Sequence, residues 1–108
     1  MSVSLLIQNT RDKEKNLYFP ISGQLTYKEE WIPLAERLNL IFIPLFLTGI
    51  PISKDNLESV IKEFELLMNY TEQIQKDNAM YKYIYTKCGQ VIEILNSFNP
   101  DSEELFIG

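Results

Sequence analysis

The chain of 108 residues contains no histidine and only one cysteine, Cys88. The missing histidine removes the usual general base near neutral pH, the most common zinc ligand and every Ser/His or Cys/His catalytic pair. A single thiol also excludes an internal disulfide, a zinc site built from several cysteines and a C-x-x-C redox motif. We therefore expect a non-enzymatic protein that needs no cofactor and no metal.

Glycine is also scarce, and the four glycines at positions 23, 49, 89 and 108 are too scattered for a dinucleotide fingerprint or a P-loop. Neighbouring carboxylates do occur, as the pairs Glu29/Glu30, Glu63/Glu65 and Glu103/Glu104. Two carboxylates divide acid and base roles only where their surroundings separate their pKa values. Glutamate usually stays exposed, so we expect all three pairs to lie on solvated surface.

Positive charge is the minority sign, because ten Lys/Arg face fifteen Asp/Glu and the net charge is −5. The only approach to a basic cluster, at residues 11–15, is interrupted by Asp12 and Glu14. Nucleic acids need clustered basic side chains to neutralise their phosphates, so we expect no nucleic-acid partner. Residues 55–108 hold ten acidic against four basic side chains. That acidic half suits a basic protein partner through complementary potentials, and the alternative is an ordinary solvated helix surface.

One long apolar run is present, at residues 40–47 (LIFIPLFL). It is shorter than the roughly 20 apolar residues of a membrane-spanning helix, so we expect no membrane span. With a single cysteine and no basic-then-apolar leader pattern, we expect a cytoplasmic protein. A run without polar alternation is typical of a strand buried on both faces. We therefore predict a central strand over residues 40–43, with a bulge or departure at Pro44, which cannot donate to a ladder.

The rest of the chain predicts further strands and three helices. Residues 3–8 and 17–21 predict a strand and a short edge strand hairpinned to it, and residues 104–107 predict a terminal strand. Thr26 and Glu29 match a capping box, so we expect a helix from there, kinked near residues 29–33 by Pro33. Its inward stripe is Tyr27, Trp31, Leu34, Ala35 and Leu38.

Two long helices should follow, one capped by Ser53 and one over residues 79–97 that turns Cys88 inward. The first has an apolar stripe and two exposed charge pairs four residues apart, Glu58/Lys62 and Glu72/Lys76. The fold class is thus a single small domain, α+β or α/β. Its three- to four-stranded sheet and about three helices follow the order β-(β)-α-β-α-α-β. If the strands at residues 3–8 and 40–43 are parallel, their helical crossover should be right-handed.

Aromatic residues make up 12% of the chain, and Tyr81, Tyr83 and Tyr85 alternate at the start of the last helix. At about 100° per residue they cannot all face the core, so we expect Tyr83 to be exposed and to form a patch with Tyr70. Tyrosine is enriched at interface hot spots, although an isolated surface tyrosine is also ordinary. The candidate partner-binding surface combines these two tyrosines with three acidic residues: Tyr70, Tyr83, Glu63, Glu65 and Glu72.

In size, acidic charge and general layout, the chain resembles the small bacterial immunity proteins, which neutralise partner toxins. The resemblance covers overall character, rests on no sequence motif and carries over no residue role. It implies an inhibitor that binds a basic protein partner. One alternative is a structural subunit or homo-oligomer that pairs through exposed edge strands, sealed by Phe19, Phe98 and Phe106. The remaining alternative is a small carboxylate-dependent enzyme that takes Mg²⁺ from outside.

Overall fold

Four strands form one antiparallel sheet in the order β2-β1-β4-β3. The computed structural model describes residues 2–74 and 77–108. The chain is an α+β domain with three main helices and the order β-β-α-α-β-α-α-β. The strands are β1 (Ser2–Asn9), β2 (Leu17–Gly23), β3 (Ile50–Ile52) and β4 (Glu103–Ile107).

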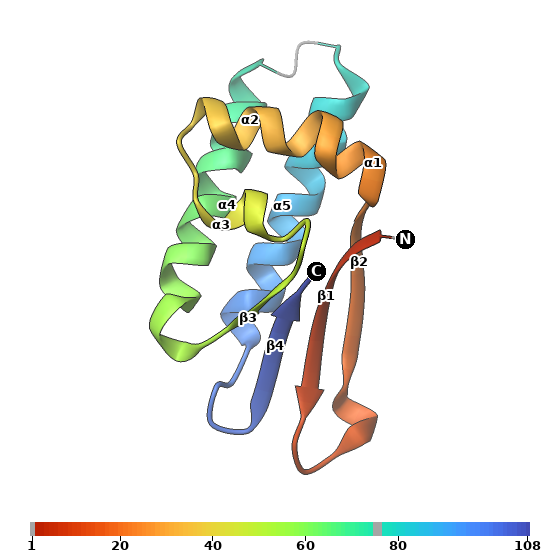
Figure 1. The fold of residues 1–108 in the computed structure, drawn as a ribbon, viewed down its shortest axis with the longest axis vertical. Helices are drawn as coiled ribbons and strands as arrows, with labels where there is room; N and C mark the ends of the chain where they lie inside the picture. The colour runs from red at the N-terminus through yellow and green to blue at the C-terminus, as the bar shows by residue number, and fades with distance from the viewer. Residues whose placement is uncertain (1, 75–76) are drawn as a thin grey trace.

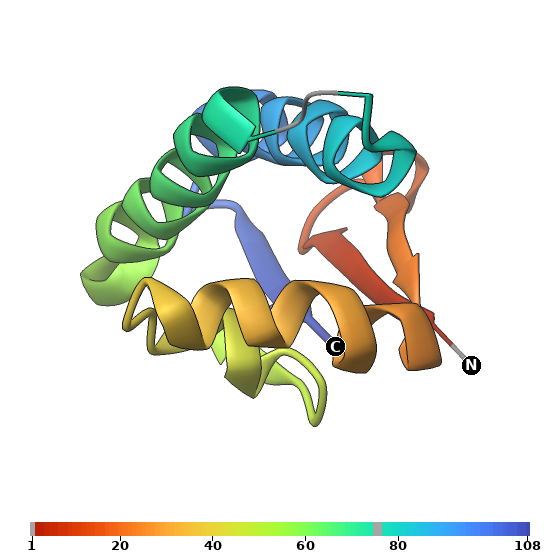
Figure 2. The ribbon, with the colours of Figure 1, turned by 90° about the horizontal axis from the view of Figure 1, so that it is seen from above.

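The helices gather on one side of this sheet. The long helices α4 and α5 pack side by side, while α1 and α2 cross the upper end of the molecule (Figures 1 and 2). Lys76, predicted to pair with Glu72, lies outside the described residues. The helical elements are α1 (Gln24–Thr26), a π-helical turn (Tyr27–Trp31), α2 (Ile32–Arg37), α3 (Phe42–Leu45), α4 (Lys54–Ile74), α5 (Ala79–Ser97) and a 3₁₀ turn (Lys13–Lys15).

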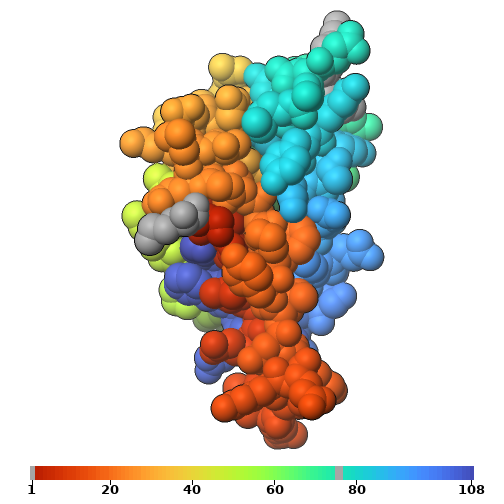
Figure 3. Space-filling view, turned by 90° about the vertical axis from the view of Figure 1, so that its right-hand side faces the viewer, coloured from red at the N-terminus to blue at the C-terminus, as the bar shows by residue number. Residues whose placement is uncertain are grey.

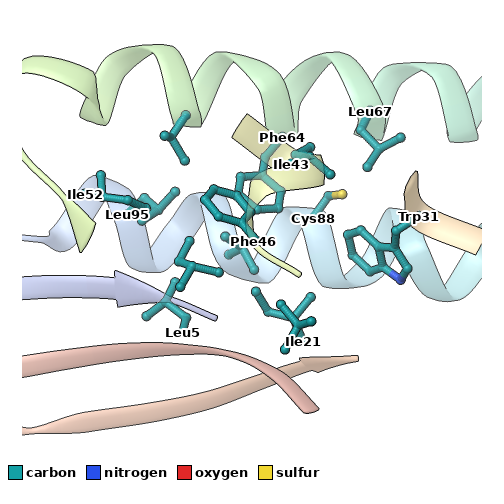
Figure 4. Packing of buried hydrophobic residues seen from close by; sticks show 14 of the residues in the cluster. Leu5, Ile21, Trp31, Ile43, Phe46, Ile52, Phe64, Leu67, Cys88 and Leu95 are labelled. Carbon is teal, nitrogen blue, oxygen red and sulfur yellow. The ribbon is translucent and has the colours of Figure 1, made fainter. Parts of the chain in front are cut away.

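A single apolar core fills the space between the sheet and the helices. Figure 4 shows Leu5 and Ile21 from the sheet facing Phe64 and Leu67 of α4, with Cys88 of α5 between the layers. The strands contribute alternate residues to this core, as expected for a sheet covered on one face. Their buried apolar side chains are Val3, Leu5, Ile7, Ile21, Ile52, Leu105 and Ile107.

Most of the predicted elements are confirmed where local signals are strong. The β1–β2 hairpin and β4 lie where the short apolar segments predict them, and α4 begins directly after Ser53. Helix α5 covers residues 79–97 as predicted, and its N-cap Asn78 accepts a hydrogen bond from the backbone N–H of Tyr81. The predicted irregularity before Pro33 is present as a π-helical turn, in which Ile32 donates to the carbonyl of Tyr27.

The capping box predicted at Thr26 is wrong. The helical segment begins at Gln24, directly after Gly23, so Thr26 already has helical backbone angles and its side chain makes no capping bond. The tight junction between β2 and α1 explains this earlier start. The predicted inward stripe is nevertheless correct at four of its positions, because Tyr27, Trp31, Leu34 and Ala35 are all buried.

The predicted central strand at residues 40–43 is also wrong. Asn39 adopts a left-handed backbone (φ 59°) and ends α2 in a Schellman-type turn, in which Leu40 donates to the carbonyl of Ala35. The chain then forms α3, and Pro44 lies in its first turn, where a missing N–H costs nothing. The interior strands are β1 and β4, and because every neighbouring pair in the sheet is antiparallel, the parallel crossover does not exist.

Candidate interaction surface

A cross-strand row of apolar side chains runs over all four strands on the face of the sheet that turns away from the core. Leu6 of β1 pairs with Tyr18 of β2 and with Phe106 of β4, and Phe106 pairs with Pro51 of β3. Their neighbours along the strands, such as Leu5 and Leu105, point into the core. We call Tyr18, Leu6, Phe106 and Pro51 the outer row.

The outer row is accessible to solvent. Tyr18 is 60% exposed and Phe106 is 38% exposed, Pro51 is also exposed and Leu6 is half-buried. The Tyr18 hydroxyl accepts a hydrogen bond from the Ser4 hydroxyl at 3.1 Å, which fixes the ring over β1. Hydrogen bonds from Ser2 and Ser4 also lower the pKa of Tyr18. The row is therefore a positioned aromatic and aliphatic surface.

Phe106 is held by two glycines that its ring contacts. A Cβ atom on Gly49 would lie 2.6 Å from Phe106 Cζ, and one on Gly108 would lie 2.7 Å from Phe106 Cε1. Gly49 also has a φ of 91°, a conformation that glycine adopts far more readily than other residues. Position 49 in the turn before β3 therefore requires glycine for two reasons: its backbone conformation and the Phe106 ring that lies against it.

A groove of about 920 Å³ continues from the outer row past the end of β3. Leu6, Phe106 and Pro51 form part of its wall, together with Phe98 and Pro100 from the connection between α5 and β4. The groove exists because β3 pairs only with residues 105–107 of β4, so the chain leaves the sheet at Ser53 beside an uncovered stretch of β4. Its volume is typical of sites that enclose part of a ligand or a partner side chain.

Two carboxylates and one ammonium group line the same groove, from Glu103, Glu104 and Lys54. Glu103 is oriented by the backbone N–H of Asn99, which donates to its Oε1 at 2.8 Å. Glu104 is exposed and lies opposite Gln8 on the outer face of the sheet. The groove therefore combines an apolar wall with a net negative rim.

A smaller cavity of about 470 Å³ opens between the β1–β2 hairpin and the end of α5. Ile7, Leu17 and Ile94 line it, and Lys15, Glu93 and Glu103 supply charges of both signs. Among the described residues, no group of three or more His, Cys, Asp or Glu side chains is placed to hold a metal ion. Neither cavity presents a ready metal-binding set.

Of the five residues predicted for the partner-binding surface, Glu63 lies in a place that the sequence did not indicate. Its side chain is buried, and its carboxylate accepts hydrogen bonds from the backbone N–H groups of Ile41, Phe42 and Ile43 at 2.9–3.1 Å. The expectation that Glu63 is solvated is therefore wrong. The physical reason is that a short helix after α2 needs acceptors for its first N–H groups, and α4 supplies them.

Glu65 and Glu72 are exposed on α4, as expected. With Glu58 they are spaced by seven residues, so the three carboxylates follow one stripe along the outside of the helix. Leu66, next to this stripe, is 45% exposed. The stripe lies on the helical side of the molecule, away from the outer row.

Tyr70 and Tyr83 do not form the predicted common patch. The Tyr70 hydroxyl accepts a hydrogen bond from Arg37 Nη1 at 3.2 Å, at the end of α2, whereas the Tyr83 hydroxyl donates to the carbonyl of Ile21 in β2 at 3.0 Å. Figure 2 shows the end of α2 and β2 at opposite sides of the molecule. Each tyrosine ties its helix to a different neighbour.

Side chains from α5 cover the free edge of β2. Lys87 Nζ donates to the carbonyl of Pro20 at 3.0 Å and lies 4.7 Å from the ring centroid of Phe19 and 5.6 Å from that of Tyr83. Figure 3 shows α5 lying directly beside β2. Since Tyr83 occupies the carbonyl of Ile21 and Pro20 has no N–H, this edge offers little to a further strand.

The other edge strand, β3, is protected by its length and by Pro51. Ser4 of β1 and Gly108 exchange both backbone hydrogen bonds, at 2.9 and 3.0 Å. By the alternation of an antiparallel ladder, Phe106 also turns its N–H and carbonyl toward β1. Its partner Pro51 then turns its own backbone away from β4, toward the open edge of the sheet. Because proline has no backbone N–H, this position cannot donate a hydrogen bond to a further strand. Both edges of the sheet therefore carry a proline at an outward position.

Three further expectations concern the thiol of Cys88, the remaining carboxylates and membrane spans. Cys88 is buried, as predicted, and burial raises the pKa of its thiol far above the ordinary value of 9.0, so it is poorly suited to react. Glu29, Glu30 and Glu104 lie at least partly in solvent. None of the helices in residues 2–74 and 77–108 combines the length and the apolar character that crossing a membrane requires.

The outer row was not among the predicted site residues, although the sequence contains a signal for it. In β1 and β4, apolar residues occupy consecutive positions, at residues 5–7 and 105–107, so each strand has to turn at least one of them away from a one-sided core. In comparisons with known proteins, no protein-family model, no curated protein and no solved structure matches the chain.

Proposed function

We propose that the chain is a non-enzymatic protein-interaction module that binds a protein partner through the outer row and the groove beside it. The observation that carries this proposal is the outer row itself: Tyr18, Leu6, Phe106 and Pro51 line up across the entire width of the sheet. A continuous apolar strip with a polar surround is the kind of surface that protein partners cover.

The composition of the strip supports a protein as the ligand. Tyrosine and phenylalanine supply large contact areas with few rotatable bonds, and aromatic residues are enriched where interface energy concentrates. Tyr18 and Phe106 are both fixed before binding, one by Ser4 and the other by the glycines that it contacts. Such preorganised side chains lose little conformational freedom on association.

The specific form that we favour is an immunity-like inhibitor of a basic protein. An inhibitor of this kind works by covering its target, so it needs no catalytic groups of its own. The net charge of −5 and the carboxylates at the groove favour a target of opposite charge. Glu65 and Glu72 on α4 form a second acidic surface, away from the outer row, which provides a comparison within the same molecule.

Site-specific photo-crosslinking tests this proposal in cells of the source organism. A photoreactive phenylalanine analogue is placed at Tyr18 on the outer row or at Leu66 on α4, two positions that are both well exposed. We expect a discrete crosslink to another protein from position 18 and none from position 66, and we expect Phe106→Asp to abolish it. Crosslinking from position 66 alone, or from neither position, would contradict the proposal.

The crosslinked protein then decides between an inhibitor and a simple adaptor. If the partner is toxic when expressed alone, co-expression of the wild-type chain should restore growth and the Phe106→Asp variant should not. A non-toxic partner would exclude the immunity-like inhibitor, and the chain would then be an interaction module of another kind.

The alternative of a homo-oligomer through edge strands is less well supported, because Pro20 and Pro51 interrupt both edges and Lys87 and Tyr83 cover one of them. Light scattering with size-exclusion chromatography measures this directly. A stable dimer that survives Phe106→Asp would favour the oligomer.

A further inference from the structure

We infer that the groove beside Phe106 selects a partner segment that carries one bulky apolar side chain flanked by lysine or arginine. This inference rests on the proposed function and specifies the chemistry of the partner. It concerns the groove past the end of β3, whereas the outer row provides contact area without distinguishing one apolar partner from another.

The wall of the groove is largely apolar. Leu6, Pro51 and Phe106 line one part of it, and Phe98 and Pro100 line another. All five present carbon-rich surfaces, and the volume of about 920 Å³ leaves room for a large side chain. Because Phe106 lies against Gly49 and Gly108, its ring has little room to move inward, and the groove is already formed without a ligand.

The rim of the groove carries a net negative charge. Glu103 and Glu104 outnumber Lys54 among the ionised groups that line the groove. The backbone N–H of Asn99 holds Oε1 of Glu103 in place, so its carboxylate is oriented before a partner arrives. Glu103 and Glu104 follow one another in β4, so their carboxylates extend toward opposite faces of the strand. Each can pair with a guanidinium or ammonium group on its own side of the inserted side chain.

The geometry of β4 explains why side chains, and not an added strand, make the contact. β3 reaches neither Glu103 nor Glu104 of β4. Glu104 turns its backbone toward β1, and Glu103, which turns toward the open edge, already donates its N–H to the carbonyl of Asn99 at 2.9 Å. A partner strand would find this donor occupied. The groove therefore has to recognise the partner through its side chains, one of them apolar and the others basic.

Nuclear magnetic resonance titration with short synthetic peptides tests the inference. The probe has a central phenylalanine between two pairs of lysines; one comparison peptide replaces the phenylalanine with alanine, and another replaces the lysines with glutamates. We expect the phenylalanine–lysine peptide to shift the amide signals of Leu6, Glu104 and Phe106. The alanine peptide should bind at least several-fold more weakly, and the glutamate peptide should not bind.

Two double variants with the same change of charge provide the matched control. Glu103→Gln with Glu104→Gln should weaken the phenylalanine–lysine peptide by roughly threefold to tenfold, as expected for two largely exposed ion pairs. Glu65→Gln with Glu72→Gln on α4 should change its affinity by less than about twofold. Glutamine at position 103 keeps an oxygen for the Asn99 N–H, so the fold is preserved, and circular dichroism checks this.

Equal binding of the lysine and glutamate peptides, signals that shift on α4 instead, or no binding at millimolar concentration would each overturn the inference. Failure of the peptide titration together with a successful crosslink from position 18 would reject the groove selectivity alone. Failure of the crosslink would reject the proposed function. A homodimeric crosslink would show that a second copy of the chain occupies this face.

Discussion

The two carboxylate oxygens of Glu63 both accept a hydrogen bond from the backbone N–H of Phe42, at 2.9 and 3.0 Å. Each oxygen also accepts a bond from a neighbouring N–H, of Ile41 or Ile43. A side chain of α4 thus takes over the capping of a helix that begins 21 residues earlier in the chain. The Tyr27 hydroxyl, which donates to the carbonyl of Ile43, holds the same segment from the other side.

Removing the Glu63 carboxylate should destabilise the protein. Glu63→Ala leaves the N–H groups of residues 41–43 without their acceptor, and we expect the free energy of unfolding to fall by about 2–3 kcal/mol. Glu65→Ala, two residues away and exposed, should change it by less than about 0.5 kcal/mol. Urea denaturation of both variants measures the difference. Equal effects would mean that the carboxylate of Glu63 contributes nothing beyond the helix itself.

A methyl group at Gly49 should disturb the outer row. Gly49→Ala strains a backbone with φ of 91° and pushes against the Phe106 ring, and we expect a loss of about 1–2 kcal/mol or more. Gly23→Ala is the control, because an added Cβ there meets nothing within 4 Å. Thermal unfolding compares the two variants. If Gly49→Ala were as stable as the control, the close approach of Phe106 would not be required.

The hydroxyl of Tyr83 should stabilise the contact between α5 and β2. Tyr83→Phe removes the hydrogen bond to the carbonyl of Ile21, at an expected cost of about 1 kcal/mol. Tyr85→Phe, on the same helix and half-buried, should have a smaller effect, because its hydroxyl has no such bond among the described residues. Hydrogen exchange at β2 amides checks the location: faster exchange in the Tyr83 variant is expected, and an unchanged rate would contradict the role.

Cys88 should make the protein less stable in alkali. Burial raises the pKa of its thiol above the ordinary value of 9.0, so the folded chain keeps the proton that the unfolded chain releases. The contribution of this thiol is therefore complete below pH 9 and is lost as the pH rises above it, by about 1 kcal/mol near pH 10. Tyr27, whose pKa is raised by burial and then by Cys88 and Glu63, adds to this loss at higher pH.

Denaturation at a series of pH values between 7 and 10 measures the alkaline loss in the wild type and in Cys88→Ala. The variant starts from a lower stability because of the missing sulfur, so the slopes are compared and not the absolute values. The variant should have the shallower slope between pH 9 and 10. Parallel slopes would show that other groups account for the effect.

Local signals determined most of the fold. The helix over residues 79–97 was predictable because its apolar repeat and the Asn78 cap act within a few residues of each other. The same holds for the start of α4 after Ser53 and for the β1–β2 hairpin, whose polar loop and alternating strands are adjacent in sequence. The burial of Cys88 followed from the same helical repeat.

Long-range contacts decided the rest. The apolar composition of residues 40–47 indicates burial but not conformation. The segment is helical because Glu63 and Tyr27, distant in sequence, supply partners for its backbone. For the same reason the sequence could not tell that Glu63 is internal while Glu65 is not.

The amino-acid sequence by itself determined where β1, β2 and β4 lie, where the two long helices begin and where α5 ends, since apolar runs, periodicity and capping act over a few residues. Only the tertiary structure decided which side of the sheet the helices cover. With the helices on the side of Leu5 and Leu105, Leu6 and Phe106 are left facing solvent beside Tyr18 and Pro51. Successive side chains of a strand point to opposite faces of the sheet, and the packing of distant segments decides which of the two faces is buried.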